Sequence, residues 1–165
     1  MKNFLKCLSA VLVLTTLILS LVGCSLFDSL SKPKDKDFSK AGMTITLTDE
    51  FTEQELVTHT AYYVSQKSIV VILKENDPLL NNYTIKKYAE LVCTANNLDE
   101  STIRSKNNYV ELTYEKDLNG KEYYYYYRCY KNGNDFWSVQ FGCETKNTEE
   151  LQPFFEKWAD TFRFD

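Results

Sequence analysis

Residues 109–143 read YVELTYEKDLNGKEYYYYYRCYKNGNDFWSVQFGC. Three runs in this stretch alternate polar with apolar residues or are rich in aromatic and β-branched side chains, as β-strands are: residues 109–115, 122–130 and 136–143. The segments between them, DLNG at 117–120 and NGND at 132–135, carry the Asn, Asp and Gly residues that tight turns require. Three strands joined by two hairpins predict an antiparallel meander.

Further strands and two helices are predicted on either side of the meander. Strand-like patterns occupy residues 43–47, 56–64 and 69–73. A helical period with Thr84 as N-cap covers residues 84–96. A second helix near 149–160 has acidic residues in its first turn, with Pro153 as an alternative first residue. This pattern predicts an α+β domain, in which helices pack on an antiparallel sheet of about six strands.

Five consecutive tyrosines, residues 123–127, stand in the second strand of the meander, and Tyr130 follows them. Because side chains alternate along a strand, Tyr124, Tyr126 and Tyr130 point to one face of the sheet. If that face is open, the three rings form a surface for a ligand or a partner protein. If the strand is central and covered on both faces, the same rings belong to the core.

The chain begins with the features of a bacterial lipoprotein signal. Two lysines precede an apolar run over residues 8–22, and the sequence LVGC at 21–24 ends it. This ending resembles a lipobox, which implies cleavage between Gly23 and Cys24 and attachment of a diacylglyceryl group, with acyl chains such as palmitate, to the Cys24 thiol through a thioether. A run of this length is marginal as a permanent span, so the alternatives are an uncleaved anchor and ordinary secretion.

The leader divides the chain into three predicted parts. Residues 1–23 form the signal peptide, residues 24–41 a flexible tether rich in Ser, Lys and Asp, and residues 42–165 a single globular domain. We therefore expect a protein on the extracytoplasmic face of the cell membrane, held there by its lipid. The formal net charge of −4 argues against a nucleic-acid partner.

No residue pattern predicts an enzyme, a metal site or a cofactor. His59 is the single histidine, and no acidic or cysteine partner stands at a telling spacing from it. Glu111 and Glu115 share one strand face, where paired carboxylates can act on glycosides but a solvated face is the plainer explanation. The other cysteines lack the CxxC spacing of zinc sites and are either buried thiols or one disulfide with a free thiol: Cys93, Cys129 and Cys143.

Two segments resemble parts of small lipoproteins from Gram-positive anaerobes: TIKKYAEL at 84–91 and DFWSVQF at 135–141. Those proteins look like members of the PsbP-like superfamily, and the order of elements over residues 43–164 is similar to theirs. The resemblance implies an α/β/α sandwich around an antiparallel sheet. It also implies a non-enzymatic protein that binds other proteins or stabilises assemblies, and it transfers no ligand residue.

The sequence thus predicts a lipid-anchored, non-catalytic binding or accessory module whose partner is an envelope or surface protein. The alternative is a receptor for a small ligand, peptide or glycan, that uses the tyrosine-rich strand. An enzyme that uses a thiol or carboxylates is a third hypothesis.

Overall fold

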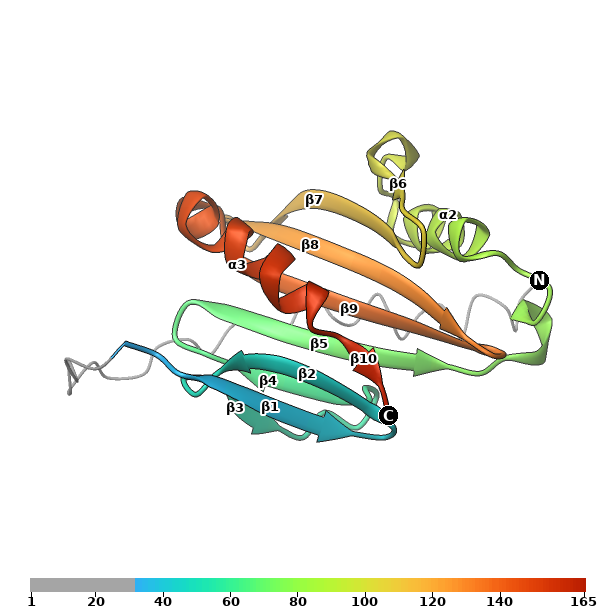
Figure 1. Cartoon of the computed structure of the whole chain (residues 1–165). Helices are drawn as coiled ribbons and strands as arrows, with labels where there is room; N and C mark the ends of the chain where they lie inside the picture. The colour runs from blue at the N-terminus through green and yellow to red at the C-terminus, as the bar shows by residue number, and fades with distance from the viewer. Residues whose placement is uncertain (1–31) are drawn as a thin grey trace.

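The computed structural model describes residues 32–165 of the chain (Figure 1). Its strands are β1 (Asp35–Lys40), β2 (Met43–Thr48), β3 (Thr52–Gln54), β4 (Ala61–Val64), β5 (Ser68–Glu75), β6 (Arg104–Ser105), β7 (Val110–Leu118), β8 (Lys121–Asn132), β9 (Asp135–Glu144) and β10 (Arg163–Phe164). Its helices are α2 (Ile85–Asn96) and α3 (Thr148–Asp160), with 3-10 turns η3 (Pro78–Leu80), η4 (Glu100–Thr102) and η5 (Thr145–Asn147). The predicted signal peptide, with Gly23 and Cys24, lies outside the described residues.

The strands form two antiparallel sheets. The larger has seven strands in the order β3-β4-β5-β9-β8-β7-β6, and the smaller has three in the order β1-β2-β10. The predicted meander is confirmed, because β7 pairs with β8 and β8 pairs with β9. The continuous apolar run in β5 is buried between β4 and β9, as a strand covered on both faces requires. The larger sheet has seven strands where about six were predicted. The sequence patterns did not predict β1, β3 and β6, and they did not show that β2 belongs to a separate sheet.

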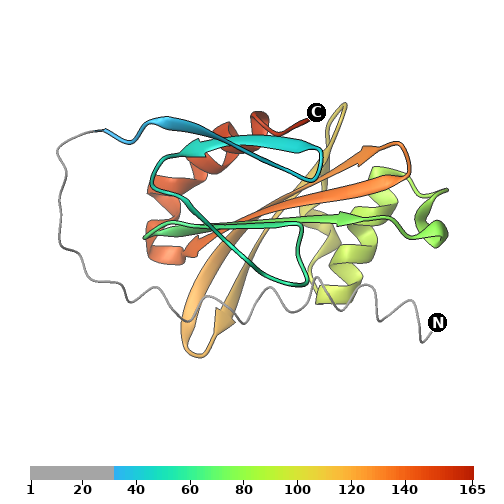
Figure 2. The same ribbon diagram turned by 90° about the horizontal axis from the view of Figure 1, so that it is seen from below.

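The domain has three layers (Figures 1 and 2). Helix α3 and the three-stranded sheet cover one face of the seven-stranded sheet, and α2 packs on the opposite face. The core on the α3 side contains Phe141, Phe155 and Trp158, and the core on the α2 side contains Tyr88 and Phe136. The α+β sandwich expected from the sequence is therefore confirmed. No helix within residues 32–165 combines the length and the apolar character needed to cross a membrane.

The start of α2 agrees with the sequence prediction, whereas Pro153 is not the first residue of α3. Thr84 caps α2 as expected, because its hydroxyl accepts a hydrogen bond from the Lys87 amide at 3.1 Å. Helix α3 begins at Thr148, so Pro153 lies inside the helix and is not its first residue. The earlier start lets Leu151 join the core, where it packs with the aromatic residues of α3.

The segment predicted as a flexible tether, residues 24–41, contains a strand. Residues 35–40 form β1, and its Phe38 pairs with Ile45 of β2 and packs 4.7 Å from the Tyr63 ring. Most other side chains of β1 are exposed and polar, so alternation of apolar residues is almost absent from its sequence. The described fold therefore starts at Asp35 and not at residue 42, which shortens the expected tether.

Candidate functional site

The structure decides between the two alternatives for the tyrosine-rich strand, because it buries the three tyrosines that were considered as a ligand or partner surface. Tyr124, Tyr126 and Tyr130 are each at most 8% exposed, because α3 and the smaller sheet cover their face. Tyr124 lies parallel to Phe155 at a centroid distance of 6.5 Å, and Tyr130 stacks on Phe162 at 4.8 Å. This corrects the expectation of an exposed aromatic face and leaves Tyr130 alone at the wall of a cavity.

That cavity lies between strand β8, the end of α3 with β10, and the loop at 105–109. Its volume is about 1030 Å³. We call it the Arg128 groove, and its lining consists of Ile85, Ser105, Lys106, Asn107, Asn108, Tyr109, Arg128, Tyr130, Lys131, Ala159, Asp160, Phe162, Arg163 and Phe164. The groove combines aromatic walls with cationic side chains, which is the composition of a binding site with a few placed polar groups.

Arg128 is the most constrained cation of the groove, with 4% of its side chain exposed. Its Nε–H donates to the Tyr126 hydroxyl at 2.6 Å, and Nη1–H donates to Asp160 Oδ1 at 2.6 Å. The guanidinium carbon lies 4.1 Å from the centroid of the Tyr109 ring. Burial lowers the pKa of Arg128, but the bond to Asp160 and the neighbouring hydroxyls raise it more, so the net pKa is raised. The guanidinium is therefore permanently charged and held in one orientation.

Glu111 of β7 extends this network. It accepts a hydrogen bond from the Tyr126 hydroxyl at 2.8 Å and lies 3.4 Å from Lys106 Nζ. Burial raises the pKa of Tyr126, and the bond to Glu111 raises it further, so the phenol stays neutral. Glu115 is exposed, whereas Glu111 is partly buried. The two carboxylates thus lie in different environments, and Glu111 helps to fix the side chains around Arg128 through its bond to Tyr126.

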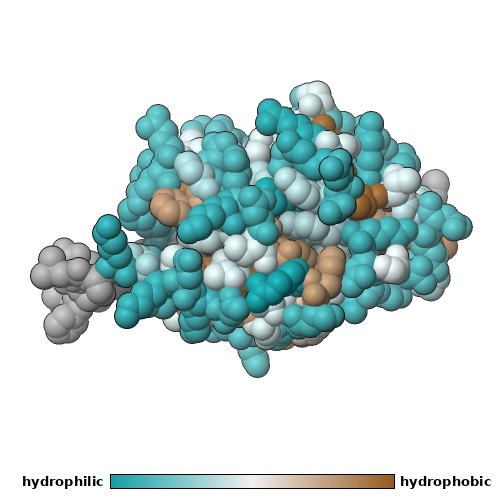
Figure 3. Space-filling view, viewed as in Figure 1, coloured by the Kyte–Doolittle hydropathy of each residue, from teal (hydrophilic) through white to brown (hydrophobic). Residues whose placement is uncertain are grey.

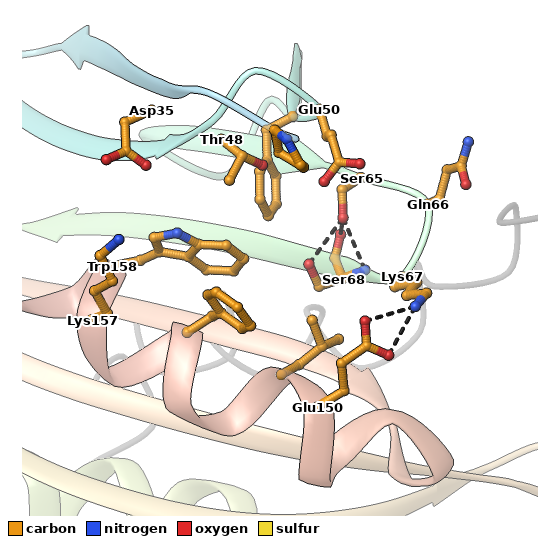
Figure 4. Close-up of a pocket in the computed structure, with 14 residues that line it drawn as sticks. Asp35, Thr48, Glu50, Ser65, Gln66, Lys67, Ser68, Glu150, Lys157 and Trp158 are labelled. Carbon is orange, nitrogen blue, oxygen red and sulfur yellow. Dashed lines mark hydrogen bonds and ion pairs between the residues drawn. The ribbon is translucent and has the colours of Figure 1, made fainter. Parts of the chain in front are cut away.

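A second cavity, which we call the Trp158 pocket, lies between α3, the turn from β4 to β5 and the start of β1 (Figure 4). Its volume is about 360 Å³, and its apolar lining consists of Pro33, Phe51, Leu151, Phe154 and Trp158. Four of its polar groups pair with one another: the Ser65 and Ser68 hydroxyls lie 2.9 Å apart, and Lys67 donates to both Glu150 oxygens at 2.7 and 2.8 Å. Its other polar lining residues are Asp35, Thr48, Glu50, Gln66 and Lys157. Because its two cations, Lys67 and Lys157, are exposed, the pocket lacks a buried and fixed charge such as Arg128 provides in the groove.

The two cavities lie at opposite ends of the β1–β2 hairpin. The Trp158 pocket is lined by Asp35 and Thr48, which face each other at one end of the ladder. The Arg128 groove is lined by Phe164, which pairs with Met43 at the other end. Since the described fold begins at Asp35, the preceding chain joins the domain at the end away from the groove.

The three cysteines after Cys24 are buried free thiols: Cys93, Cys129 and Cys143. Burial raises the pKa of Cys93 and of Cys143 to about 11, and it raises that of Cys129 further. His59 is partly buried, burial lowers its pKa, and its Nδ1 lies 2.8 Å from the Thr58 hydroxyl. Within residues 32–165, no group of three His, Cys, Asp or Glu side chains is arranged to hold a metal ion.

We expect these three cysteines to resist iodoacetamide in the folded protein near neutral pH. A thiol alkylates through its thiolate, and a pKa raised to about 11 leaves very little of that form. Alkylation should be at least about a hundredfold slower than in the chain unfolded in urea. Mass spectrometry of the cysteine peptides measures both rates, and rapid labelling of any of the three in the native protein would contradict the burial described.

No protein-family model matches the chain, and no curated protein matches it. Solved structures do resemble it. The cyanobacterial PsbP of Synechocystis is 9% identical with a TM-score of 0.51, over 87% of this chain and 99% of that one. A crystal structure from Bacteroides thetaiotaomicron is 11% identical with a TM-score of 0.59, over 79% of this chain and 48% of that one. The domain therefore has a PsbP-like fold, as the resemblance in the sequence implied, and likeness at this level of identity concerns the fold alone.

Sequence patterns did not single out Arg128. The sequence did contain an indication of its importance, because alternation places Arg128 on the same strand face as Tyr126 and Tyr130. A charged side chain on a face that becomes core needs fixed polar partners, so it marks a position of interest. The partners themselves, Glu111 and Asp160, stand in other elements and carry no pattern that links them to it.

Proposed function

We propose that the protein is a lipid-anchored, extracytoplasmic binding or accessory module without catalysis of its own. The observation that carries the proposal is the fixed guanidinium of Arg128 in an open groove. A guanidinium whose pKa is raised keeps its charge at physiological pH, so it binds and orients an anion but does not relay protons. The raised pKa of the cysteine thiols and the lowered pKa of His59 favour the same conclusion.

The proposed anchor and the shortened tether support a role at the membrane surface. If Cys24 carries the lipid, only residues 25–34 separate it from β1. Such a segment spans at most about 35 Å when extended and roughly 15–20 Å as a relaxed chain. The tether would join the domain at the end away from the Arg128 groove, which leaves the groove free to meet an envelope or surface protein.

Cys24→Ala should release the protein from the membrane fraction or leave it as an uncleaved precursor. Two or more acyl chains give stable anchoring, and the substitution removes the sulfur that holds them. Cell fractionation with immunoblotting and the mass of the purified chain measure the result. Cys7→Ala is the matched control, because Cys7 lies in the predicted signal peptide and its loss should leave both anchoring and mature mass unchanged. A Cys24→Ala protein that kept its membrane location and its mass would contradict the proposed lipid.

A further inference from the structure

One nitrogen of the Arg128 guanidinium is left for a ligand. Nε and Nη1 are engaged by Tyr126 and Asp160, and the Tyr109 ring covers one face. Among residues 32–165, Nη2 has no hydrogen bond as close as these two; the Tyr130 hydroxyl, which donates to Ala159 O, lies near enough to raise the pKa of the guanidinium, and Arg128 belongs to the lining of the groove. The partners that fix the guanidinium therefore leave Nη2, with two N–H groups, available on a preorganised cation.

The groove also holds one more cation than its acidic partners balance. Arg128 pairs with Asp160 at 2.6 Å, Lys106 with Glu111 at 3.4 Å, and Arg163 with an aspartate of β1 at 2.9 Å. Lys131 is different: its ammonium donates to two backbone carbonyls, Asn81 O at 3.0 Å and Tyr83 O at 2.8 Å. Carbonyl oxygens fix the ammonium but do not neutralise it. Lys131 binds these carbonyls on the α2 side of β8, the face opposite Arg128, so its charge adds to the groove as a whole and not to Nη2 itself. A groove with one surplus positive charge suits a ligand with one negative group.

The aromatic walls of the groove indicate that the ligand also has an apolar group. Tyr130, Phe162 and Phe164 form an aromatic cluster, with Tyr130 4.8 Å from Phe162 and 6.4 Å from Phe164. Figure 3 shows that hydrophilic side chains dominate the surface around α3 and β10, with hydrophobic colour confined to small separate areas. An apolar group of a ligand therefore finds the aromatic wall of the groove here and no broad apolar face.

The edge of β8 adds a third feature. Strand β7 pairs with β8 from Leu118 only as far as Val110, which faces Cys129, whereas β8 continues to Asn132. In the described part of the chain, residues 130–132 thus have a partner strand, β9, on one side only. A strand edge with no neighbour can receive an extended peptide through backbone hydrogen bonds.

We propose that the Arg128 groove binds the C-terminal carboxylate of an extended peptide whose last side chain is apolar. The carboxylate lies on Arg128 Nη2, the last side chain packs against Tyr130 and Phe162, and the peptide backbone follows the free edge of β8. This inference rests on the proposed binding function, but it does not depend on the proposed lipid anchor.

The test is the binding of fluorescent pentapeptides that end in phenylalanine to the detergent-solubilised full chain, measured by anisotropy. The peptide with a free C-terminus should bind about 10–100-fold more tightly than its C-terminal amide, as loss of one charge-assisted contact predicts. A peptide ending in aspartate should bind weakly as well, because its last side chain is not apolar. Equal binding of acid and amide would overturn the proposal, and so would no binding of either.

Variants locate the site. Arg128→Gln should weaken binding of the free acid by about tenfold or more. Lys131→Gln should weaken it by a smaller factor, because Lys131 contributes only to the net charge of the groove, and Lys67→Gln in the Trp158 pocket should leave it unchanged. Lys131→Gln keeps the test valid if Arg128→Gln fails to fold, which thermal melting reports. Tight binding that is unchanged by both substitutions would overturn the assignment.

Benzoate as competitor separates a free aromatic carboxylate from a peptide. Displacement of the peptide by benzoate at concentrations similar to those of the peptide would overturn the part of the proposal assigned to the β8 edge. Failure of the Cys24→Ala prediction would leave these outcomes intact, so the two proposals fail separately.

Discussion

Phe155→Ala should lower the free energy of unfolding by about 3–5 kcal/mol. The ring of Phe155 is fully buried between α3 and the seven-stranded sheet. Its centroid lies 5.4 Å from that of Phe141 in β9 and 6.0 Å from that of Trp158 on the same helix. Truncation would leave a cavity that these rigid rings cannot fill, so the cost includes both lost burial and the void. Urea titration followed by tyrosine and tryptophan fluorescence measures the loss.

Phe154→Ala is the matched control, because Phe154 is the preceding residue of the same helix and 45% of it is exposed. Its ring contacts Trp158 at a centroid distance of 5.7 Å but has solvent on its other side. The expected loss is at most about 1 kcal/mol, as for other surface positions. Equal losses for the two variants would show that α3 does not present Phe155 to the sheet. A small domain is stable by only about 5–15 kcal/mol in total, so the difference between the variants is easy to resolve.

The fate of the tyrosine-rich strand shows how far periodicity alone predicts structure. Alternation correctly placed Tyr124, Tyr126 and Tyr130 on one face, because the side-chain period of a strand is a local property. Whether that face is open depends on α3 and on β1, β2 and β10, which come from both ends of the chain. Sequence patterns within β8 hold no information about that cover. The choice between a ligand surface and a core strand at β8 therefore depends on the second sheet and α3, which cover these rings.

The strands that the sequence missed share one physical cause. Strand β1 carries a single large apolar side chain, Phe38, and β3 is exposed at all of its residues. Both lie at the edge of a sheet, where they form by backbone pairing with a stronger neighbour and need little apolar surface of their own. Alternation of apolar residues cannot detect such strands. This is why the predicted tether extended to residue 41 although the fold begins at Asp35.

The Arg128 groove was hidden for a different reason. Asp160 holds Arg128 from 32 residues away, and Glu111 lies on a neighbouring strand. A sequence shows that a charged residue stands on an inward face, but it does not show which carboxylate meets it. The free edge of β8 is equally nonlocal, since it arises because β7 starts at Val110 while β8 runs on to Asn132. The Arg128 guanidinium, the aromatic wall and the free edge of β8 therefore come together at one cavity only after the chain has folded.

Gly142→Ala should lower the free energy of unfolding by about 1–3 kcal/mol, although alanine is normally the better residue in a strand. Gly142 lies in β9 between Ile69 of β5 and Tyr125 of β8. A Cβ atom there would stand 2.9 Å from Tyr125 Cε1 and 3.3 Å from Ile69 Cγ1, which is closer than carbon atoms pack. The Tyr125 ring cannot move aside easily, because it is fully buried and stacks on Tyr114 at 4.8 Å. Valine at this position should cost more than alanine.

Two comparisons separate this clash from a general effect of replacing glycine. Gly120 has a φ of +79° in an open turn with nothing within 4 Å of an added Cβ, so Gly120→Asn should change stability by only a few tenths of a kcal/mol. In a Tyr125→Leu background, the additional loss caused by Gly142→Ala should shrink, because the aromatic carbon that the methyl group meets is gone. A loss at Gly142 that is independent of residue 125 would mean that the ring does not lie over the glycine. The absence of a side chain at Gly142 thus leaves the space that the Tyr125 ring occupies against the middle strand of the sheet.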